Sequence, residues 1–237
     1  MPRLDQSCAA FRPDRGWRTR RIGFTACFLW MAVLPLLACA TDTLTITTQG
    51  NDKGAAPCMA CHGANGGGMA GTGNPRLAGL NAAYLQKQLD DFASGTRAST
   101  MMQATAKALS DDQRQALAIY YSKQPMPRAL AKPAAPMPAA DSVGAVLATR
   151  GRWDQQVPAC VQCHGPGGVG VGGHFPPLAG QSASYIEAQL KAWQQGTRHN
   201  DPLQLMQHLS SVLSEQDIRA VAEWFATQPL TAKEAAP

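Results

Sequence analysis

The sequence predicts an all-α protein made of two tandem domains, and three observations lead to this prediction. The chain has 237 residues, enough for two domains of roughly 100 residues each. The two halves match each other at an offset close to 101 positions, a period too long for a solenoid unit and typical of a duplicated domain. Apolar residues in both halves recur at helical spacing between N-capping residues and glycines, which favours a small bundle of helices in each half.

The internal repeat sets the domain boundaries. The offset is 102 at the cysteine motifs, 101 through the middle and 104 near the end of each copy, so two small insertions separate the copies. The segments that match most closely are 75–79 with 176–180, 84–89 with 185–190, 95–97 with 196–198 and 109–110 with 213–214. We expect domains over residues 41–126 and 143–232, followed by a tail over 233–237. The Pro/Ala-rich stretch 127–142 is typical of a semi-rigid extended linker.

Three helical stretches are expected in each copy, in the same order. The first carries a cysteine motif and leads into a glycine-rich loop; the second follows an N-cap and ends at a glycine; the last begins with a capping box. The residues expected at these boundaries are Asn81, Gly95, Ser110 and Gln113 in the first copy and Ser182, Gly196, Ser214 and Asp217 in the second. The aromatic residues of these helices are expected in the two cores.

Residues 1–40 carry most of the basic excess and are typical of an export signal. They hold six Arg and two Asp, whereas the rest of the chain holds 15 Lys/Arg and 14 Asp/Glu. A basic cluster over 18–21 precedes the apolar stretch 22–38, and cleavage is expected after Ala40. An uncleaved membrane anchor and a lipoprotein signal with lipid on Cys39 are the alternatives. The near-neutral body gives no support for nucleic acid as a partner.

Four of the seven cysteines lie outside the predicted signal, in the segments Cys58-Met59-Ala60-Cys61-His62 and Cys160-Val161-Gln162-Cys163-His164. C-x-x-C-H is the attachment signature of c-type haem, because two thiols on one helical turn can form thioethers while the adjacent histidine binds iron. Disulfides, one zinc site or a redox pair are the alternatives, but none requires histidine after both pairs. The 98 residues between Cys61 and Cys160 also exceed the roughly 15–20 typical of a zinc ribbon. Two covalently bound c-type haems are therefore predicted.

The ligand opposite each histidine decides the chemistry of the iron. His62 and His164 each fill one axial position. An open site on the other side admits peroxide or gas, whereas a methionine closes the coordination sphere and raises the reduction potential, which suits electron transfer.

The repeat selects one methionine in each copy as that second ligand. After residue 138 the chain has one methionine, Met206, and it lies eight positions before the expected start of the last helix. Met102 holds the same place in the first copy, so it is preferred over Met101 and Met69. Three histidines have no counterpart in the first copy and are expected in loops or on exposed helix faces: His174, His199 and His208. His208, two positions after Met206, is the best alternative ligand for the second iron.

Together these motifs resemble cytochrome c4, a family of two-domain, di-haem class I cytochromes c. The shared features are the paired C-x-x-C-H motifs, Pro-x-Leu-Ala-Gly, Tyr-x-x-x-Gln-Leu, Gly-Thr-Arg and Met-x6-Leu-Ser, and they cover roughly residues 50–230. The resemblance implies a two-lobed protein of the bacterial periplasm, often attached to the membrane, that shuttles electrons toward terminal oxidases. It also implies that the segments at Pro75 and Pro176 pack on the histidine side of each haem, where a backbone carbonyl orients the imidazole.

We expect an electron carrier with no substrate of its own. Its partners would be redox proteins: a quinol-oxidising complex or a dehydrogenase as donor and a terminal oxidase as acceptor. One alternative is a peroxidase-like di-haem enzyme in which one iron lacks a sixth ligand, and another is a cytochrome subunit of a membrane dehydrogenase. No His/Glu/Arg constellation recurs near the two motifs, which disfavours the enzyme because acid–base groups are missing.

Overall fold

The structure is a computed structural model that describes residues 34–126 and 138–229, with the backbone alone given for residues 34–41. Most of the predicted signal, the linker residues 127–137 and the predicted tail lie outside the described residues. Within the described ranges the regular structure is helical, and extended pairing is limited to four isolated bridges. The predicted all-α fold with two domains is confirmed.

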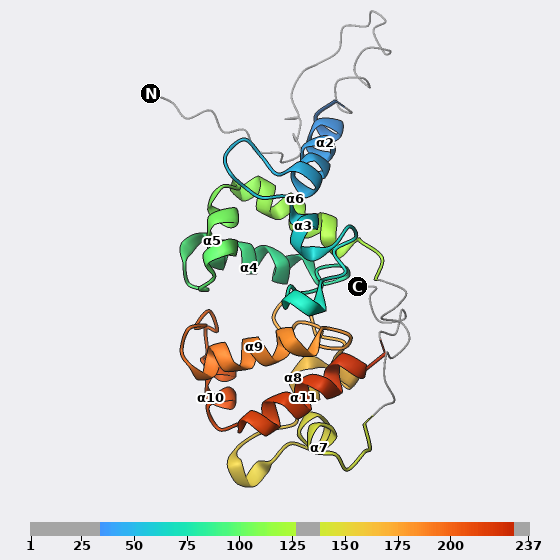
Figure 1. The fold of residues 1–237 in the computed structure, drawn as a ribbon, viewed down its shortest axis with the longest axis vertical. Coiled ribbons are helices and arrows are strands. Elements are labelled where there is room, and N and C mark those ends of the chain that lie inside the picture. The colour runs from blue at the N-terminus through green and yellow to red at the C-terminus, as the bar shows by residue number, and fades with distance from the viewer. Residues whose placement is uncertain (1–33, 127–137, 230–237) are drawn as a thin grey trace, which may run out of the picture.

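The two domains repeat the same order of helices. The first comprises α2 (Leu34–Gln49), α3 (Cys58–His62), the 3-10 turn η1 (Ala70–Thr72), α4 (Ala82–Ser94), α5 (Thr100–Lys107) and α6 (Asp111–Ser122). The second comprises α7 (Val143–Thr149), the 3-10 turns η3 (Trp153–Gln155) and η4 (Pro166–Gly168), α8 (Val161–His164), α9 (Ala183–Gln194), α10 (Leu205–Ser211) and α11 (Glu215–Thr227). Figure 1 shows the domains stacked along the long axis, with α4 of one facing α9 of the other across the boundary.

The predicted helix boundaries are found where side chains satisfy the first backbone N–H groups. Asn81 accepts hydrogen bonds at the start of α4, and Ser182 accepts one at the start of α9. Complete capping boxes open α6 and α11: each pairs a serine with the residue three positions later, Ser110 with Gln113 and Ser214 with Asp217. The stops are also confirmed, since Gly95 and Gly196 adopt positive φ at the ends of α4 and α9.

One prediction about the order of elements is wrong. The cysteine motifs lie on the second helix of each domain, because α2 precedes α3 and α7 precedes α8. These preceding helices are structural parts of the domains: Ile46 on α2 and Leu147 on α7 hold the same repeat position, and each is 1% exposed. Burial of such large aliphatic side chains contributes roughly 1.5–3 kcal/mol each.

Each domain has its own hydrophobic core, and most of the predicted aromatic residues lie in or against these cores, whereas Tyr185 bonds to Arg97 across the domain boundary. Leu117 and Tyr121 of α6 are buried with Ile46 in the first, and Trp224 and Phe225 of α11 are buried in the second. The last helix of each domain packs on the preceding long one, α6 on α4 and α11 on α9. The repeat therefore builds two separate cores, as expected for a duplicated domain.

The glycine-rich loop after each cysteine motif passes close to the core aromatic ring. Gly66 and Gly168 have φ of 68° and 82°, and a Cβ on either would lie 2.5–2.6 Å from a ring atom of Tyr121 or Phe225. Any other residue would therefore meet both backbone strain and a steric clash. This contact fixes the loop that follows each histidine.

Candidate functional site

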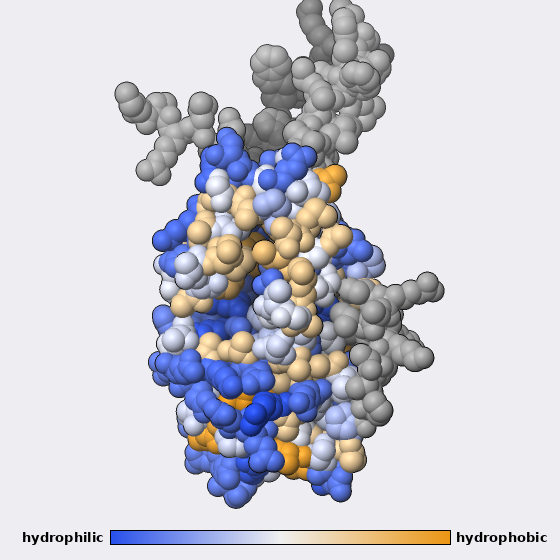
Figure 2. Space-filling view, viewed as in Figure 1, coloured by the Kyte–Doolittle hydropathy of each residue, from blue (hydrophilic) through white to orange (hydrophobic). Residues whose placement is uncertain are grey.

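A cavity of about 880 Å³ crosses the domain boundary and is lined from both sides. The predicted site residues line this cavity: Cys58, Cys61, His62 and Met102 from the first domain and Cys160, Cys163, His164 and Met206 from the second. In Figure 2, weakly hydrophobic residues surround a hollow on the upper, first domain. A mostly apolar cavity with a few converging ligand atoms is the environment in which proteins hold large organic cofactors.

The two histidines are oriented alike by backbone carbonyls. Nδ1 of His62 lies 2.9 Å from the oxygen of Pro75, and Nδ1 of His164 lies 2.8 Å from that of Pro176, as the family resemblance implies. Because a carbonyl only accepts, Nδ1 carries the proton and Nε2 is the nitrogen free to bind a metal. Burial lowers the pKa of both imidazoles, against the opposing effect of the carbonyl bond, so the neutral form that binds iron is favoured.

The four cysteines of the two motifs are free thiols in the structure. Burial raises the pKa of Cys58, and it raises the pKa of Cys160 to about 11. Neither pair is closed as a disulfide, and within the described ranges no three or more His, Cys, Asp or Glu side chains cluster as a metal-ion site. The structure thus gives the disulfide and zinc alternatives no support.

Each selected methionine lies in the first turn of a short helix and has its own N–H held by a side chain. Ser99 Oγ accepts from the N–H of Met102 (3.3 Å) on α5, and the Asp201 carboxylate accepts from the N–H of Met206 on α10. Met206 also packs against the core of the second domain. The two N–H contacts hold the helix turns from which both methionine side chains reach the cavity.

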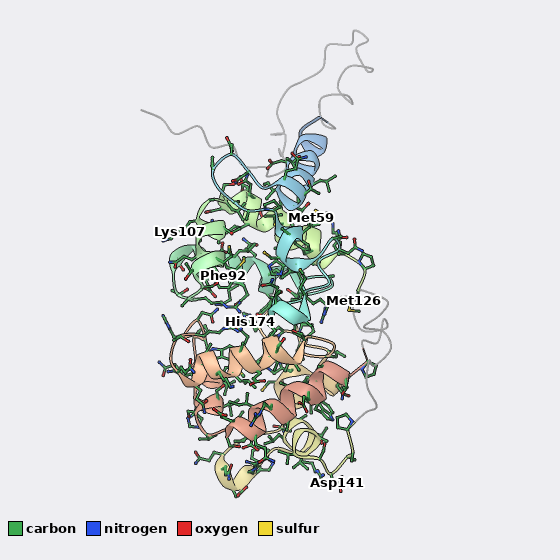
Figure 3. All side chains as sticks on the ribbon, viewed as in Figure 1. Met59, Phe92, Lys107, Met126, Asp141 and His174 are labelled. Carbon is green, nitrogen blue, oxygen red and sulfur yellow. The ribbon has the colours of Figure 1, made fainter. Side chains whose placement is uncertain are left out.

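The alternative ligands are placed less favourably. Met69 lies away from this cavity, and Met101 lines it but is 63% exposed. His208 is exposed and does not line it either. His174, expected in a loop with no part in the site, does line the cavity from the second domain, and Figure 3 shows it at the boundary between the domains. It was missed because the first copy has no matching histidine.

Sequence reasoning also missed the polar network that joins the domains. Arg97 donates to Gln88 (2.8 Å) in its own domain and to Gln189 (2.7 Å) and Tyr185 (2.8 Å) in the other. Arg198 mirrors this, donating to Gln189 (2.9 Å) in its own domain and to Gln88 (3.1 Å) across the boundary. Their backbones also form an isolated antiparallel bridge. Two arginines and two glutamines of equivalent repeat positions therefore form a closed, nearly symmetric ring.

The two guanidinium groups bring positive charge to the cavity wall. Both arginines are buried and line the cavity, and their hydrogen-bond acceptors in this ring are neutral. Each guanidinium stacks on an aromatic ring, Arg97 on Phe92 (4.5 Å) and Arg198 on Trp193 (3.9 Å). Burial, and the neighbouring Arg97, lower the pKa of Arg198. Carboxylate groups of a ligand would pair with this charge, so these arginines would suit the propionate groups of bound haems.

The two halves of the chain match two known families of cytochrome domains. Residues 50–124 match "Cytochrome c" and residues 145–225 match "Cytochrome C oxidase, cbb3-type, subunit III". The cytochrome c4 of Pseudomonas aeruginosa is 37% identical over 172 residues, which is 72% of this chain and 83% of that protein. The chain belongs to the cytochrome c4 family. As a member of this family it is a di-haem electron carrier with two c-type haems.

Two further relatives are linked by name to a dehydrogenase. The thiosulfate dehydrogenase electron acceptor of Stutzerimonas stutzeri is 51% identical over 195 residues, covering 82% of this chain and 89% of that protein. The solved structure of thiosulfate dehydrogenase from Marichromatium purpuratum is 42% identical, with a TM-score of 0.73 over 82% of this chain. This chain spans only 41% of that larger protein. The fold of the cytochrome c4 family thus occurs both as a separate protein and within a longer chain.

Proposed function

We propose that each C-x-x-C-H motif holds one haem through two thioethers, with histidine and methionine as axial ligands. The residues assigned are Cys58, Cys61, His62 and Met102 for one haem and Cys160, Cys163, His164 and Met206 for the other. The observation that carries this assignment is that all eight line one cavity, with Nδ1 of both histidines engaged by a carbonyl. The haems, when bound, supply reversible one-electron chemistry.

The protein side chains tune this chemistry toward carrying electrons. The Met102 and Met206 thioethers are soft, neutral donors that favour Fe(II), so they raise the reduction potential relative to a second histidine. Hydrogen bonds from the backbone N–H groups of both methionines hold the helix turns that carry these side chains. The carbonyls of Pro75 and Pro176 orient the histidines. A filled, rigid coordination sphere changes little on reduction, which suits a carrier with no substrate of its own.

We infer that the electron donor is a dehydrogenase that oxidises thiosulfate, and that the acceptor is a terminal oxidase. Support comes from two relatives named as electron acceptors of thiosulfate dehydrogenase, at 51% and 52% identity, and from the solved thiosulfate dehydrogenase that contains a similar region. Two haems per chain match a two-electron oxidation, because each iron takes up one electron.

We also infer that the protein is exported to the periplasm. Helix α2 begins at Leu34, so cleavage after Ala40 would fall within it and leave Thr41–Gln49 on the mature protein. That remainder includes the buried side chains of Thr43, Ile46 and Thr47, so the first core keeps its helix. Within the described ranges, no helix combines the length and hydropathy that crossing a membrane requires.

Stopped-flow mixing with purified thiosulfate dehydrogenase and thiosulfate tests the donor. We expect reduction of two haems per chain, within the turnover time of the dehydrogenase. Reduction by ascorbate but not by the dehydrogenase would reject this donor and leave the carrier function intact. Low-spin spectra of both irons in the resting protein, without peroxide turnover, are expected of a carrier; a high-spin iron that consumes peroxide would favour the enzyme.

A further inference from the structure

Arg76 and Gln181 depart from the internal repeat, and they bond to each other. The second copy has Pro177 where the first has Arg76, and the first copy has Leu80 where the second has Gln181. Each copy therefore builds its domain without one of the two residues. Their shared position at the boundary indicates a role that arises only when the domains are joined.

Gln181 clamps the backbone of Arg76 through both atoms of its side-chain amide. The N–H of Arg76 donates to Gln181 Oε1 (2.9 Å), and Gln181 Nε2 donates to the carbonyl of Arg76 (3.1 Å). All of these groups are buried. One side chain of the second domain thus satisfies both backbone hydrogen-bonding groups of a buried residue in the first.

The guanidinium of Arg76 bonds the same loop in both domains. Nη1 donates to the carbonyl of Ala78 (2.6 Å) and Nη2 to that of Ala179 (3.1 Å), and these two alanines hold equivalent repeat positions. Each alanine comes three residues after the proline whose carbonyl orients a histidine, Pro75 or Pro176. One side chain therefore connects both histidine-orienting loops.

Among the described residues, Arg76 has no acidic partner for its charge. The side chain is 1% exposed, lines the haem cavity, and takes part in none of the ion pairs within the described ranges. Burial lowers its pKa to about 10, so the guanidinium is still charged at neutral pH. A buried charge without a counter-ion acts strongly on other charges nearby, because the surroundings screen it weakly.

We propose that the fixed positive charge of Arg76, which is shared by both haem sites, raises both reduction potentials, and that Gln181 holds Arg76 at the boundary. A positive charge disfavours Fe(III), which carries one more positive charge than Fe(II). Because the guanidinium bonds equivalent carbonyls of the two loops, it acts on both irons. This inference goes beyond the proposed donor and does not depend on it.

The test is a spectroelectrochemical titration of the holoprotein at pH 7. Arg76→Met is expected to increase the Fe(III)/Fe(II) ratio of both haems at least tenfold at a fixed applied potential, a shift of about 59 mV for one electron. Arg76→Gln is also neutral but keeps a hydrogen-bond donor, and it should give the same shift. It replaces Arg76→Met in the test if the methionine variant does not fold. Arg76→Lys keeps the charge and should stay within threefold of the wild type. Arg150→Gln, which removes an exposed arginine bonded to a single carbonyl, is the control.

Gln181→Leu separates the charge of Arg76 from the position of its loop, because it removes the amide that binds the Arg76 backbone and leaves the guanidinium in place. Leucine is the residue that the first copy has at the equivalent position. This substitution should leave both potentials within threefold but split the thermal unfolding of the holoprotein into two calorimetric transitions. A potential shift in only one haem of the neutral Arg76 variants, or in neither, would overturn the proposal. So would a Gln181→Leu shift as large as that of Arg76→Met, since loop position and not charge would then set the potentials.

Discussion

The Asp201 carboxylate accepts a hydrogen bond from the backbone N–H of Met206, the residue assigned as the second ligand of the second iron. Helix α10 needs this bond, because its N-cap residue Gln204 has a left-handed φ of 51° and its side chain caps no backbone N–H. In the first domain the equivalent bond comes from Ser99, the N-cap of α5. In both methionine helices a side chain therefore accepts a hydrogen bond from the N–H of the methionine, but the accepting residues do not hold equivalent positions in the repeat.

Replacing Asp201 should loosen the second methionine alone. Asp201→Ala removes a cap that contributes about 1 kcal/mol, so the first turn of α10 should fray and Met206 should leave the iron more readily. We expect faster carbon monoxide binding to the second haem and a weaker sulfur-to-iron charge-transfer band, with the first haem unchanged. Asp201→Asn keeps an accepting oxygen and is the matched control. Equal effects of the two substitutions would show that the carboxylate charge, and not the cap, is what matters.

Exchange of the methionines tests the axial assignment directly. Met206→His should keep the second haem low-spin but lower its potential by a substantial part of the roughly 0.8 V range that axial ligands span. Met206→Ala should open the iron to water or carbon monoxide, and Met102 variants should do the same in the first domain. Met101→Ala is the neighbouring control, and both potentials should stay nearly unchanged. Loss of the sulfur band in Met101→Ala but not in Met102→Ala would show that the repeats are aligned one residue out.

Three helices of each domain and their caps could be predicted because they depend on residues close together in sequence, whereas α5 and α10, which carry the methionines, were not predicted. Ser110 with Gln113 and Ser214 with Asp217 are visible as pairs three positions apart, and both form capping boxes. The preceding helices were missed although Ile46 and Leu147 match in the repeat, since α2 continues from the apolar signal and α7 follows the linker. A comparison of the flanks of both motifs would have found them.

The contacts across the boundary could not be predicted, because the hydrogen bonds there join residues 88–114 positions apart. The repeat aligns Arg97 with Arg198 and Gln88 with Gln189, but alignment gives equivalence and not contact. Asn200, which donates to Gln88 and Asp91, has no matching residue type in the first copy. The pairing of the domains is tertiary information that local patterns do not contain.

Removal of Arg97 should weaken the boundary. Its guanidinium makes hydrogen bonds to Gln88, Gln189 and Tyr185, so Arg97→Gln should lower the free energy of unfolding of the holoprotein by about 3 kcal/mol. Guanidinium denaturation, followed by haem absorbance, measures this loss. Arg150→Gln is the control and should not change the midpoint, because that exposed side chain makes one backbone contact. A variant as stable as the wild type would mean that the ring of arginines and glutamines adds nothing to docking.

Acid should destabilise the second domain through Asp217. Two hydrogen bonds from Arg152, at 2.7 and 3.0 Å, lower the pKa of this carboxyl to about 2, against burial, which raises it. Since the folded pKa lies below the ordinary value of 3.8, the stabilisation is complete above about pH 5 and is lost as pH falls toward 2. We expect about 1–2 kcal/mol at pH 7, allowing for the partial exposure of Arg152.

Asp217→Gln isolates this ion pair, because glutamine completes the capping box at the equivalent position of the first domain. The difference in unfolding free energy between wild type and variant should be largest above pH 5 and close to zero near pH 2. A difference that is constant over this range would assign the loss to packing instead. Gln113→Ala in the first domain should lower stability equally at every pH, since no titrating group is removed.

The last prediction concerns how the carrier meets its redox partners. The chain after the predicted signal has 15 basic and 14 acidic residues, so neither sign of charge dominates and long-range steering is expected to be weak. Leu203 is 85% exposed beside Met206's helix and lines the haem cavity, so an apolar side chain lies at the point where a partner would approach the second haem. Apolar contact there should supply much of the affinity.

The rate constant for electron transfer with the dehydrogenase should therefore fall only a few-fold between low and physiological salt. Leu203→Asp should slow it about tenfold, whereas Val212→Asp, also on an exposed site but away from the cavity, should not. A steep salt dependence with no effect of Leu203→Asp would instead assign docking to a local charged patch.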